Sequence, residues 1–151
     1  MRDDLQPRVL IGREAGDHCA IRVLGRLHAR ADDYWDGNWL MSSIDLVIGP
    51  FDGTVPASLR AEELTTFRDQ LGVLHQSLTG AAVLDSMEEW LHLVVSVTSS
   101  GAVEVTGKAR DRLGRANELL FQIDDLDQSD LPKIIEALDE VGALFPVIGH
   151  P

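Results

Sequence analysis

The chain has 151 residues, of which 44% are hydrophobic and 25% are charged, and its formal net charge at pH 7 is −12. This length and composition are typical of one folded domain with its own hydrophobic core, so we expect residues 1–151 to form a single domain. The 13 basic and 25 acidic residues argue against nucleic-acid binding and suit a cationic partner. A surface that is merely soluble is the alternative explanation of this charge.

The only cysteine and the N-terminal residues indicate the compartment. Cys19 has no second cysteine to pair with, which excludes an intrachain disulfide and favours a reducing compartment. Asp3 and Asp4 stand where a signal peptide has a basic region followed by an apolar run. The longest apolar stretches are far shorter than the ~20 residues of a membrane span. We therefore expect a cytoplasmic protein that does not contact membranes.

The first residues predict a β-hairpin. Apolar and polar residues alternate over residues 19–27, which is the period of a half-buried strand. A shorter apolar run over residues 8–12 precedes it across a polar turn, so we expect the two runs to pair. The next segment, residues 29–38, has no period and is predicted as a loop.

Two further strands and a helix are predicted next. Alternation resumes over residues 39–48 and again over 55–59, and the Asp52-Gly53 dipeptide between these runs is a hairpin signal. The period then changes. Over about 61–78, apolar residues recur at steps of three and four with acidic residues in the first turn, which predicts a helix. Gly80 lies just past its expected end.

The second half of the chain predicts a β-meander and another helix. Four strands are expected, over residues 81–84, 90–98, 103–110 and 118–124. Their apolar face needs a cover, which an apolar stripe at helical spacing over about 130–145 supplies, with Ser129 or Asp130 as N-cap and Pro132 in the first turn. The sequence thus predicts an α+β fold: an antiparallel, strongly twisted sheet of about seven to eight strands, built from N-terminal hairpins and a C-terminal meander, with two amphipathic helices packed on it.

No catalytic, cofactor-binding or metal-binding constellation is recognisable. The phosphate-binding patterns G-x-G-x-x-G and the P-loop are absent, as is the hydrolase pattern G-x-S-x-G. The five histidines are scattered, without an H-x-H or H-E-x-x-H pair for zinc. Cys19 alternates onto an apolar strand face, which predicts a buried, inert thiol. We therefore predict no catalytic residue, cofactor or metal, although paired-carboxylate catalysis depends on distances that a sequence does not give.

Two acidic segments have residues in common with metal-binding loops. Residues 32–37 resemble part of a calcium loop, but Tyr34 stands at the third position and Ser43 replaces the bidentate glutamate, which argues against calcium. In residues 124–130, capping of the following helix and attraction to its N-terminus explain most of the acidic residues without a ligand. Neither segment is therefore predicted to bind a metal.

The aromatic residues beside the first acidic segment are the most unusual feature. Tyr34, Trp35 and Trp39 are flanked by acidic residues, and tyrosine and tryptophan are frequent interface anchors. A tryptophan that plugs the core is the alternative explanation for Trp35 or Trp39. The candidate partner-binding residues are Asp32, Asp33, Tyr34, Trp35, Asp36, Trp39, Asp124, Asp125 and Asp127.

The order of apolar residues and glycines carries a family resemblance. In the first half it includes Trp39, Leu40, Ile44, Gly49, Phe51 and Gly53, followed by the helix over 64–78 and Gly80. In the second half it includes Glu89, Leu91, Leu93, Gly101, the run 103–107, Leu119 and Phe121. It ends with the helix start 127–132 and with Phe145-Pro146. Over roughly residues 34–147 this order resembles that of bacterial WapI-family immunity proteins. The predicted hairpin within residues 1–28 lies outside the resemblance.

The resemblance implies a non-enzymatic antitoxin. Such a protein binds and neutralises the toxin domain of a polymorphic or contact-dependent system, commonly a nuclease, and an acidic inhibitor suits the basic surface that a nuclease presents to its substrate. The resemblance supplies no catalytic residues. A small-molecule-binding or regulatory domain with a pocket between sheet and helices is the alternative function, and an enzyme is a third. The sequence does not indicate the oligomeric state.

Overall fold

The first half of the chain forms a four-stranded antiparallel sheet followed by a helix. The computed structural model describes residues 6–151, so Asp3 and Asp4 lie outside it. The strands follow the chain order β1 (Arg8–Gly12), β2 (His18–Arg26), β3 (Trp39–Ile48) and β4 (Phe51–Arg60). A one-turn helix, α1 (Tyr34–Gly37), lies between β2 and β3, and α2 (Ala61–Ser77) follows β4 directly.

The second half repeats this order of elements. Its antiparallel sheet contains β5 (Ala81–Asp85), β6 (Leu91–Val97), β7 (Ala102–Arg110) and β8 (Glu118–Asp127). A short 3-10 turn, η2 (Gln128–Asp130), then leads into α3 (Leu131–Leu144). Each half of the described chain therefore consists of four antiparallel strands and then a long helix.

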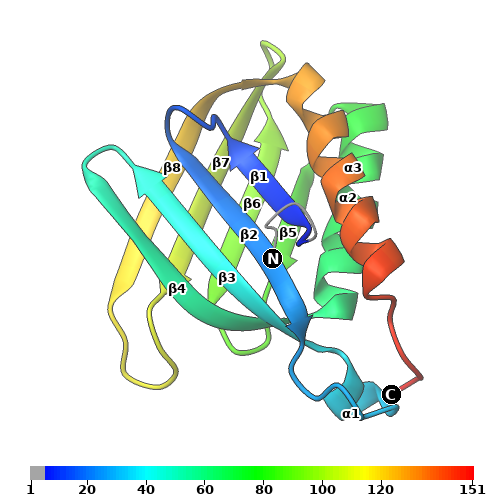
Figure 1. Cartoon of the computed structure of the whole chain (residues 1–151). Coiled ribbons are helices and arrows are strands. Elements are labelled where there is room, and N and C mark those ends of the chain that lie inside the picture. The colour runs from blue at the N-terminus through cyan, green and yellow to red at the C-terminus, as the bar shows by residue number, and fades with distance from the viewer. Residues whose placement is uncertain (1–5) are drawn as a thin grey trace.

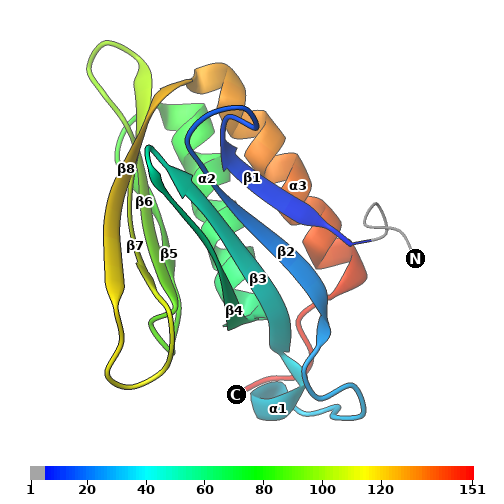
Figure 2. The ribbon, with the colours of Figure 1, turned by 60° about the vertical axis from the view of Figure 1, so that its left-hand side comes forward.

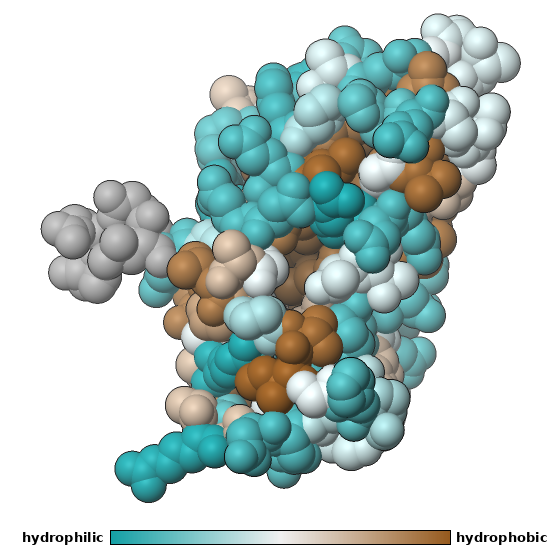
Figure 3. All heavy atoms as spheres, turned by 90° about the vertical axis from the view of Figure 1, so that its right-hand side faces the viewer, coloured by the Kyte–Doolittle hydropathy of each residue, from teal (hydrophilic) through white to brown (hydrophobic). Residues whose placement is uncertain are grey.

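The long helix of each half packs against the sheet of the other half. α2 and α3 lie side by side along one side of the molecule (Figures 1 and 2). α2 packs mainly against β5 and α3 packs mainly against β1, so each helix lies against an edge strand of the sheet from the other half. Their outer side is largely hydrophilic, with hydrophobic residues in separate patches (Figure 3). The tertiary contacts thus join both halves into one body.

A continuous hydrophobic core lies between the two sheets and the helices. The inner strand positions alternate as the sequence predicts, and fully buried residues come from both sheets, among them Ile21, Ile44, Leu93 and Val105. The helices add a buried stripe each, namely Leu64, Phe67, Leu71 and Leu74 from α2 and Leu131, Ile134, Leu138 and Val141 from α3. A fully buried side chain of this kind stabilises the fold by roughly 1.5–3 kcal/mol.

The predicted α+β class is confirmed: residues 6–151 form eight antiparallel strands and two long amphipathic helices. Both helices end within one residue of their predicted bounds. The strands, however, divide into two sheets of four instead of forming one sheet. Alternation shows which face of a strand is buried but not which strand pairs with which, and α2 carries the chain from β4 to the start of a separate ladder.

Three local features also differ from the prediction. The β3–β4 turn falls at Gly49-Pro50, because Ile48 pairs with Phe51, and the predicted turn residues Asp52-Gly53 lie within β4. Leu78 takes the left-handed position at the end of α2, with a φ of 57°. The predicted loop contains α1, which begins where the Asp33 carboxylate accepts a hydrogen bond from the Asp36 amide at 3.1 Å.

Candidate partner-binding surfaces

Arg60, the last residue of β4, lies at the centre of the predicted aromatic segment. Its side chain is only 1% exposed. Its guanidinium carbon lies 4.7 Å from the ring centre of Trp39, 5.2 Å from that of Tyr34 and 5.6 Å from that of Trp35. Because these distances are within the range of cation–π attraction, the three rings surround one buried cation.

Hydrogen bonds fix the same arginine to the backbone of α1. Arg60 Nη1 donates to the Trp35 carbonyl and Nη2 to the Tyr34 carbonyl, both at 2.8 Å, while Nε donates to the Glu62 carboxylate. The Glu63 carboxylate accepts from the Arg60 amide at 2.8 Å, and burial raises the pKa of Glu63. Bonds that involve an ionised group are the stronger ones, so the conformation of α1 depends on Arg60.

The C-terminal residues hold the segment from its other side (Figure 1). Asn38 is fully buried and donates through Nδ2 to the carbonyls of Tyr34 and Ile148, both at 2.9 Å, and its Oδ1 accepts from the Ile148 amide at 2.8 Å. Arg26 donates to the carbonyls of Gly37 and Pro146, both at 2.7 Å. α1 is thus braced by β2, by the β4–α2 junction and by the chain end.

Some of the candidate partner-binding side chains in and around α1 are exposed to solvent. Asp32, Asp33 and Asp36 are exposed, and Trp35 is 53% exposed. Tyr34 and Trp39 are half-buried around Arg60. A core-plug role therefore does not apply to Trp35. We call Asp32, Asp33, Tyr34, Trp35, Asp36 and Trp39 the aromatic loop surface.

The second acidic segment forms a β-bulge near the end of β8. Val105 pairs with Ile123 but Val103 pairs with Leu126, so two residues of β8, Asp124 and Asp125, stand opposite one residue of β7. Asp125 has a left-handed φ of 67°. The side chains of Asp124, Asp125 and Asp127 are exposed, and we call these three residues the bulge surface.

An ion pair ties this segment to the β1–β2 turn. Arg13 donates to both carboxylate oxygens of Asp130, at 2.5 and 3.1 Å, and to the Asp125 carbonyl at 2.9 Å. The Asp127 carboxylate accepts from the Ser129 amide at 2.8 Å and caps η2, whereas Asp130 is the N-cap residue of α3, as predicted, but makes no side-chain cap bond to it. The bond from Arg13 lowers the pKa of Asp130, and the bonds from Ser129 lower the pKa of Asp127.

The lowered pKa of Asp130 makes the stability of the fold depend on pH. At a pH between the folded-state and unfolded-state pKa values of Asp130, the unfolded chain binds more protons than the folded chain. The stabilisation that Asp130 contributes is therefore complete above pH ~4 and is lost as the pH falls through its folded-state pKa. We expect Asp130→Asn to lower the melting temperature at neutral pH, and the wild-type and variant temperatures to converge in acid. Thermal melts across the acid range test this. Asp52→Asn, at an exposed aspartate, is the control, and a constant gap between wild type and Asp130→Asn would contradict the prediction.

The aromatic loop surface and the bulge surface lie at opposite ends of the molecule. Figures 1 and 2 place α1 beside the C-terminus, whereas the end of β8 meets the β1–β2 turn and the start of α3 at the far end. The nine predicted residues therefore do not form one continuous surface.

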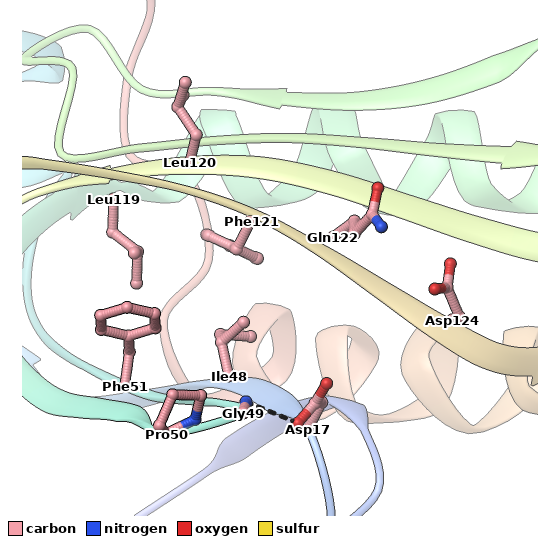
Figure 4. Close-up of a pocket in the computed structure, with 10 residues that line it drawn as sticks. All are labelled: Asp17, Ile48, Gly49, Pro50, Phe51, Leu119, Leu120, Phe121, Gln122 and Asp124. Atoms are coloured by element: carbon pink, nitrogen blue, oxygen red, sulfur yellow. Dashed lines mark hydrogen bonds between the residues drawn. The ribbon is translucent and has the colours of Figure 1, made fainter.

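A cleft that the sequence analysis did not predict lies beside the bulge surface. It has a volume of about 510 Å³ and opens between the β3–β4 turn and β8 (Figure 4). Asp17 accepts a hydrogen bond from the Gly49 amide at 2.9 Å at one end of it. The one sequence feature that could have indicated the cleft is Phe51, an aromatic residue between the predicted strands over 39–48 and 55–59.

With this geometry established, the family model described as the immunity protein WapI-like family matches residues 10–146. The chain belongs to the WapI-like immunity protein family. The match begins within β1, so it includes most of the hairpin that the resemblance left outside. Membership supports an immunity-protein role and suggests a non-enzymatic function that involves a protein partner.

The other comparisons add little to the WapI-like assignment. No curated protein matches the chain. A solved structure described as MRP1/MRP2 of Trypanosoma bruciei is 11% identical, covers 91% of this chain and 85% of its own, and has a TM-score of 0.43. That score is too low to support any statement on the function of this WapI-like protein.

Cys19 of this WapI-like chain is a core residue. Cys19 is fully buried, which raises the pKa of its thiol to about 12, in agreement with the predicted inert thiol. Within residues 6–151 there is no group of three or more His, Cys, Asp or Glu residues placed to hold a metal ion. None of the helices over these residues has both the length and the apolar character needed to cross a membrane.

A cavity also lies where the alternative, small-molecule function would place it, between a sheet and a helix. It measures about 370 Å³ and is lined by residues of β1, the β1–β2 turn and α3 that include Arg8, Arg13 and Lys133. Arg8 pairs with Glu14 and Arg13 pairs with Asp130, so both guanidinium groups already have carboxylate partners. Nothing in this cavity favours a ligand over the WapI-like role.

Proposed function

We propose that this protein is a cytoplasmic antitoxin, which binds the toxin domain of a polymorphic or contact-dependent system and thereby protects the bacterial cell that makes the toxin. The observation that carries the proposal is the family match over residues 10–146. The net charge of −12 supports a basic partner, such as a nuclease domain whose surface is built to receive phosphates.

Inhibition by this protein requires complementary charge and a rigid surface, without a chemical step. The acidic inhibitor and the nucleic-acid substrate compete for the same basic surface of the toxin. Opposite charges also accelerate association, which is useful when the toxin must be captured before it reaches its substrate. Because an association of this kind is screened by salt, its rate constant should fall as ionic strength rises.

We propose the aromatic loop surface as a contact with the toxin. Trp35 is exposed and lies edge-to-face with Tyr34, with the ring centres 5.0 Å apart. Arg60 holds the backbone of both residues, so little conformational entropy is lost when the exposed ring is buried by a partner. Exposed carboxylates of Asp32 and Asp36 flank this anchor and suit lysine or arginine side chains at the rim.

The experiment is to identify the neighbouring genes and to co-express this protein with a toxin domain that one of them encodes. We expect the wild-type protein to restore growth and to co-elute with the toxin domain in size-exclusion chromatography. Lack of both protection and a complex would rule out the proposed function.

The loop contact is tested with the double variant Trp35→Ala/Asp36→Ala. Loss of a hot-spot anchor is expected to weaken toxin binding by about 30-fold or more, measured by calorimetry, with little change in melting temperature because both side chains are exposed. The matched control is Leu113→Ala/Glu136→Ala, since Leu113 is also 53% exposed and Glu136 is exposed. Unchanged affinity would remove the loop from the interface, and a large drop in melting temperature would assign Trp35 a structural role.

A further inference from the structure

The cleft beside β8 is the open end of the core between the two sheets. Phe51 pairs with Ile48 across the β3–β4 turn and points to the face that becomes buried further along the same strands. Leu119 and Phe121 of β8 point toward these residues from the other sheet (Figure 4). Phe51 nevertheless remains 61% exposed, so the fold leaves an aromatic ring uncovered at the mouth of the cleft.

The floor of the cleft is preformed. Phe121 is 7% exposed, and its ring lies over Gly107, its cross-strand partner. A Cβ atom at Gly107 would stand 2.3 Å from the nearest ring atom, so only glycine leaves room for this ring position. A partner that enters the cleft therefore meets a floor whose shape is already fixed, which lowers the entropy lost on binding.

The two ends of the cleft differ in chemistry. Phe51, Pro50 and Leu119 form the apolar end, and Asp17 and Asp124 line the other end, where the Asp124 carboxylate points to the outer side of β8 (Figure 4). Of the described residues that line the cleft, none is a lysine or arginine. Arg13, in the neighbouring turn, is paired with Asp130. The cleft thus suits an occupant that is apolar at one end and cationic at the other.

The strands that border the cleft favour a polypeptide as occupant. β4 ends the order of the first sheet and β8 ends the order of the second, so both are edge strands with backbone groups that no ladder uses. Such groups can pair with an extended polypeptide, whereas a second copy of this acidic chain would bring like charge to the same place.

We propose that this cleft binds a basic polypeptide segment of the partner. An apolar side chain of the segment lies against Phe51 and Leu119, and neighbouring lysine or arginine side chains reach Asp17 and Asp124. The proposed function is needed only to identify the partner as the toxin domain. Since the bulge surface adjoins the cleft, Asp125 and Asp127 extend the acidic end.

The chemistry of the cleft is tested with a defined probe. The peptide Lys-Arg-Trp-Arg-Lys is titrated into isotope-labelled full-length protein and followed by amide chemical shifts. We expect shifts concentrated at Gly49, Phe51 and Leu119, and at least about tenfold weaker binding when the tryptophan of the peptide is replaced by alanine. Shifts elsewhere on the protein, or equal binding of the two peptides, would overturn the proposal.

The toxin domain provides the second test. Phe51→Ala/Asp124→Asn is expected to weaken toxin binding by about tenfold or more. The control Val73→Ala/Glu140→Gln removes an apolar side chain of similar exposure, 65%, and one exposed carboxylate from the helices, and should bind as wild type does. If wild type binds the toxin and the cleft variant binds equally well, the inference fails and the proposed function stands.

Two further outcomes distinguish the cleft proposal from the proposed function. If the peptide maps to the cleft but the protein neither binds nor neutralises the toxin, the proposed function fails and the basic-segment site stands. If sedimentation shows a wild-type dimer that Phe51→Ala converts to a monomer, the occupant is a second copy of the chain, and the inference is overturned.

Discussion

Truncation of the chain before Asp130 is expected to give an insoluble or molten product. The deletion removes the four buried residues of α3, Leu131, Ile134, Leu138 and Val141. Each contributes roughly 1.5–3 kcal/mol when fully buried, and their sum is comparable to the whole net stability of a typical domain, ~5–15 kcal/mol. The deletion also uncovers β1 and one side of α2, because α3 packs on both.

Circular dichroism, dye binding and thermal melting measure this outcome. We expect residual secondary structure, strong binding of a hydrophobic dye and no cooperative melt. Leu138→Ala in the full chain is the graded comparison and should lower the free energy of unfolding by about 2–5 kcal/mol while the melt stays cooperative. A truncated protein that still melts cooperatively would show that the two sheets are stable without α3.

Replacement of Arg60 by alanine is expected to lower the free energy of unfolding by about 3–5 kcal/mol, because a fully buried cation is removed and the partly buried Glu62 carboxylate is left without its partner. The carbonyls of Tyr34 and Trp35 lose their donors at the same time. The Trp39 ring loses the cation 4.7 Å from its centre. We therefore expect α1 to loosen as well as the fold to weaken.

Urea denaturation followed by circular dichroism gives the change in stability, and tryptophan fluorescence reports the loosening around Arg60. Arg60→Lys is the control, since lysine keeps the charge but lacks the planar set of donors that reaches two carbonyls and a carboxylate. It should fall between wild type and Arg60→Ala. An alanine variant with wild-type stability would mean that the aromatic loop surface is held by its other contacts.

Local periodicity explains why much of the fold could be predicted. The alternation over residues 39–48 gives the bounds of β3, and the apolar stripe over 61–78 gives α2 to within one residue, because both patterns follow directly from which face is buried. Pairing between distant segments has no such local signal. The division into two sheets and the hydrogen bonds between Asn38 and Ile148, 110 residues apart, therefore had to come from the structure.

The candidate surfaces were predictable only in part, for the same reason. Composition singled out the acidic and aromatic residues, yet it gave no sign that Trp35 and Asp124 would lie at opposite ends. Arg60 follows an alternating strand and precedes an acidic helix start, where an arginine is ordinarily exposed, and its burial depends on carbonyls 25 and 26 residues earlier. The cleft escaped prediction because its two walls, at Phe51 and Leu119, belong to different sheets.

The exchange of helices between the halves also constrains how the protein is made. The first strand, β1, packs against α3, which is the last helix of the chain. During synthesis the first sheet leaves the ribosome long before that helix does, so β1, one of its edge strands, stays uncovered until α3 has been made. Neither half covers its own edge strand, so the two halves of the fold reach their final packing together.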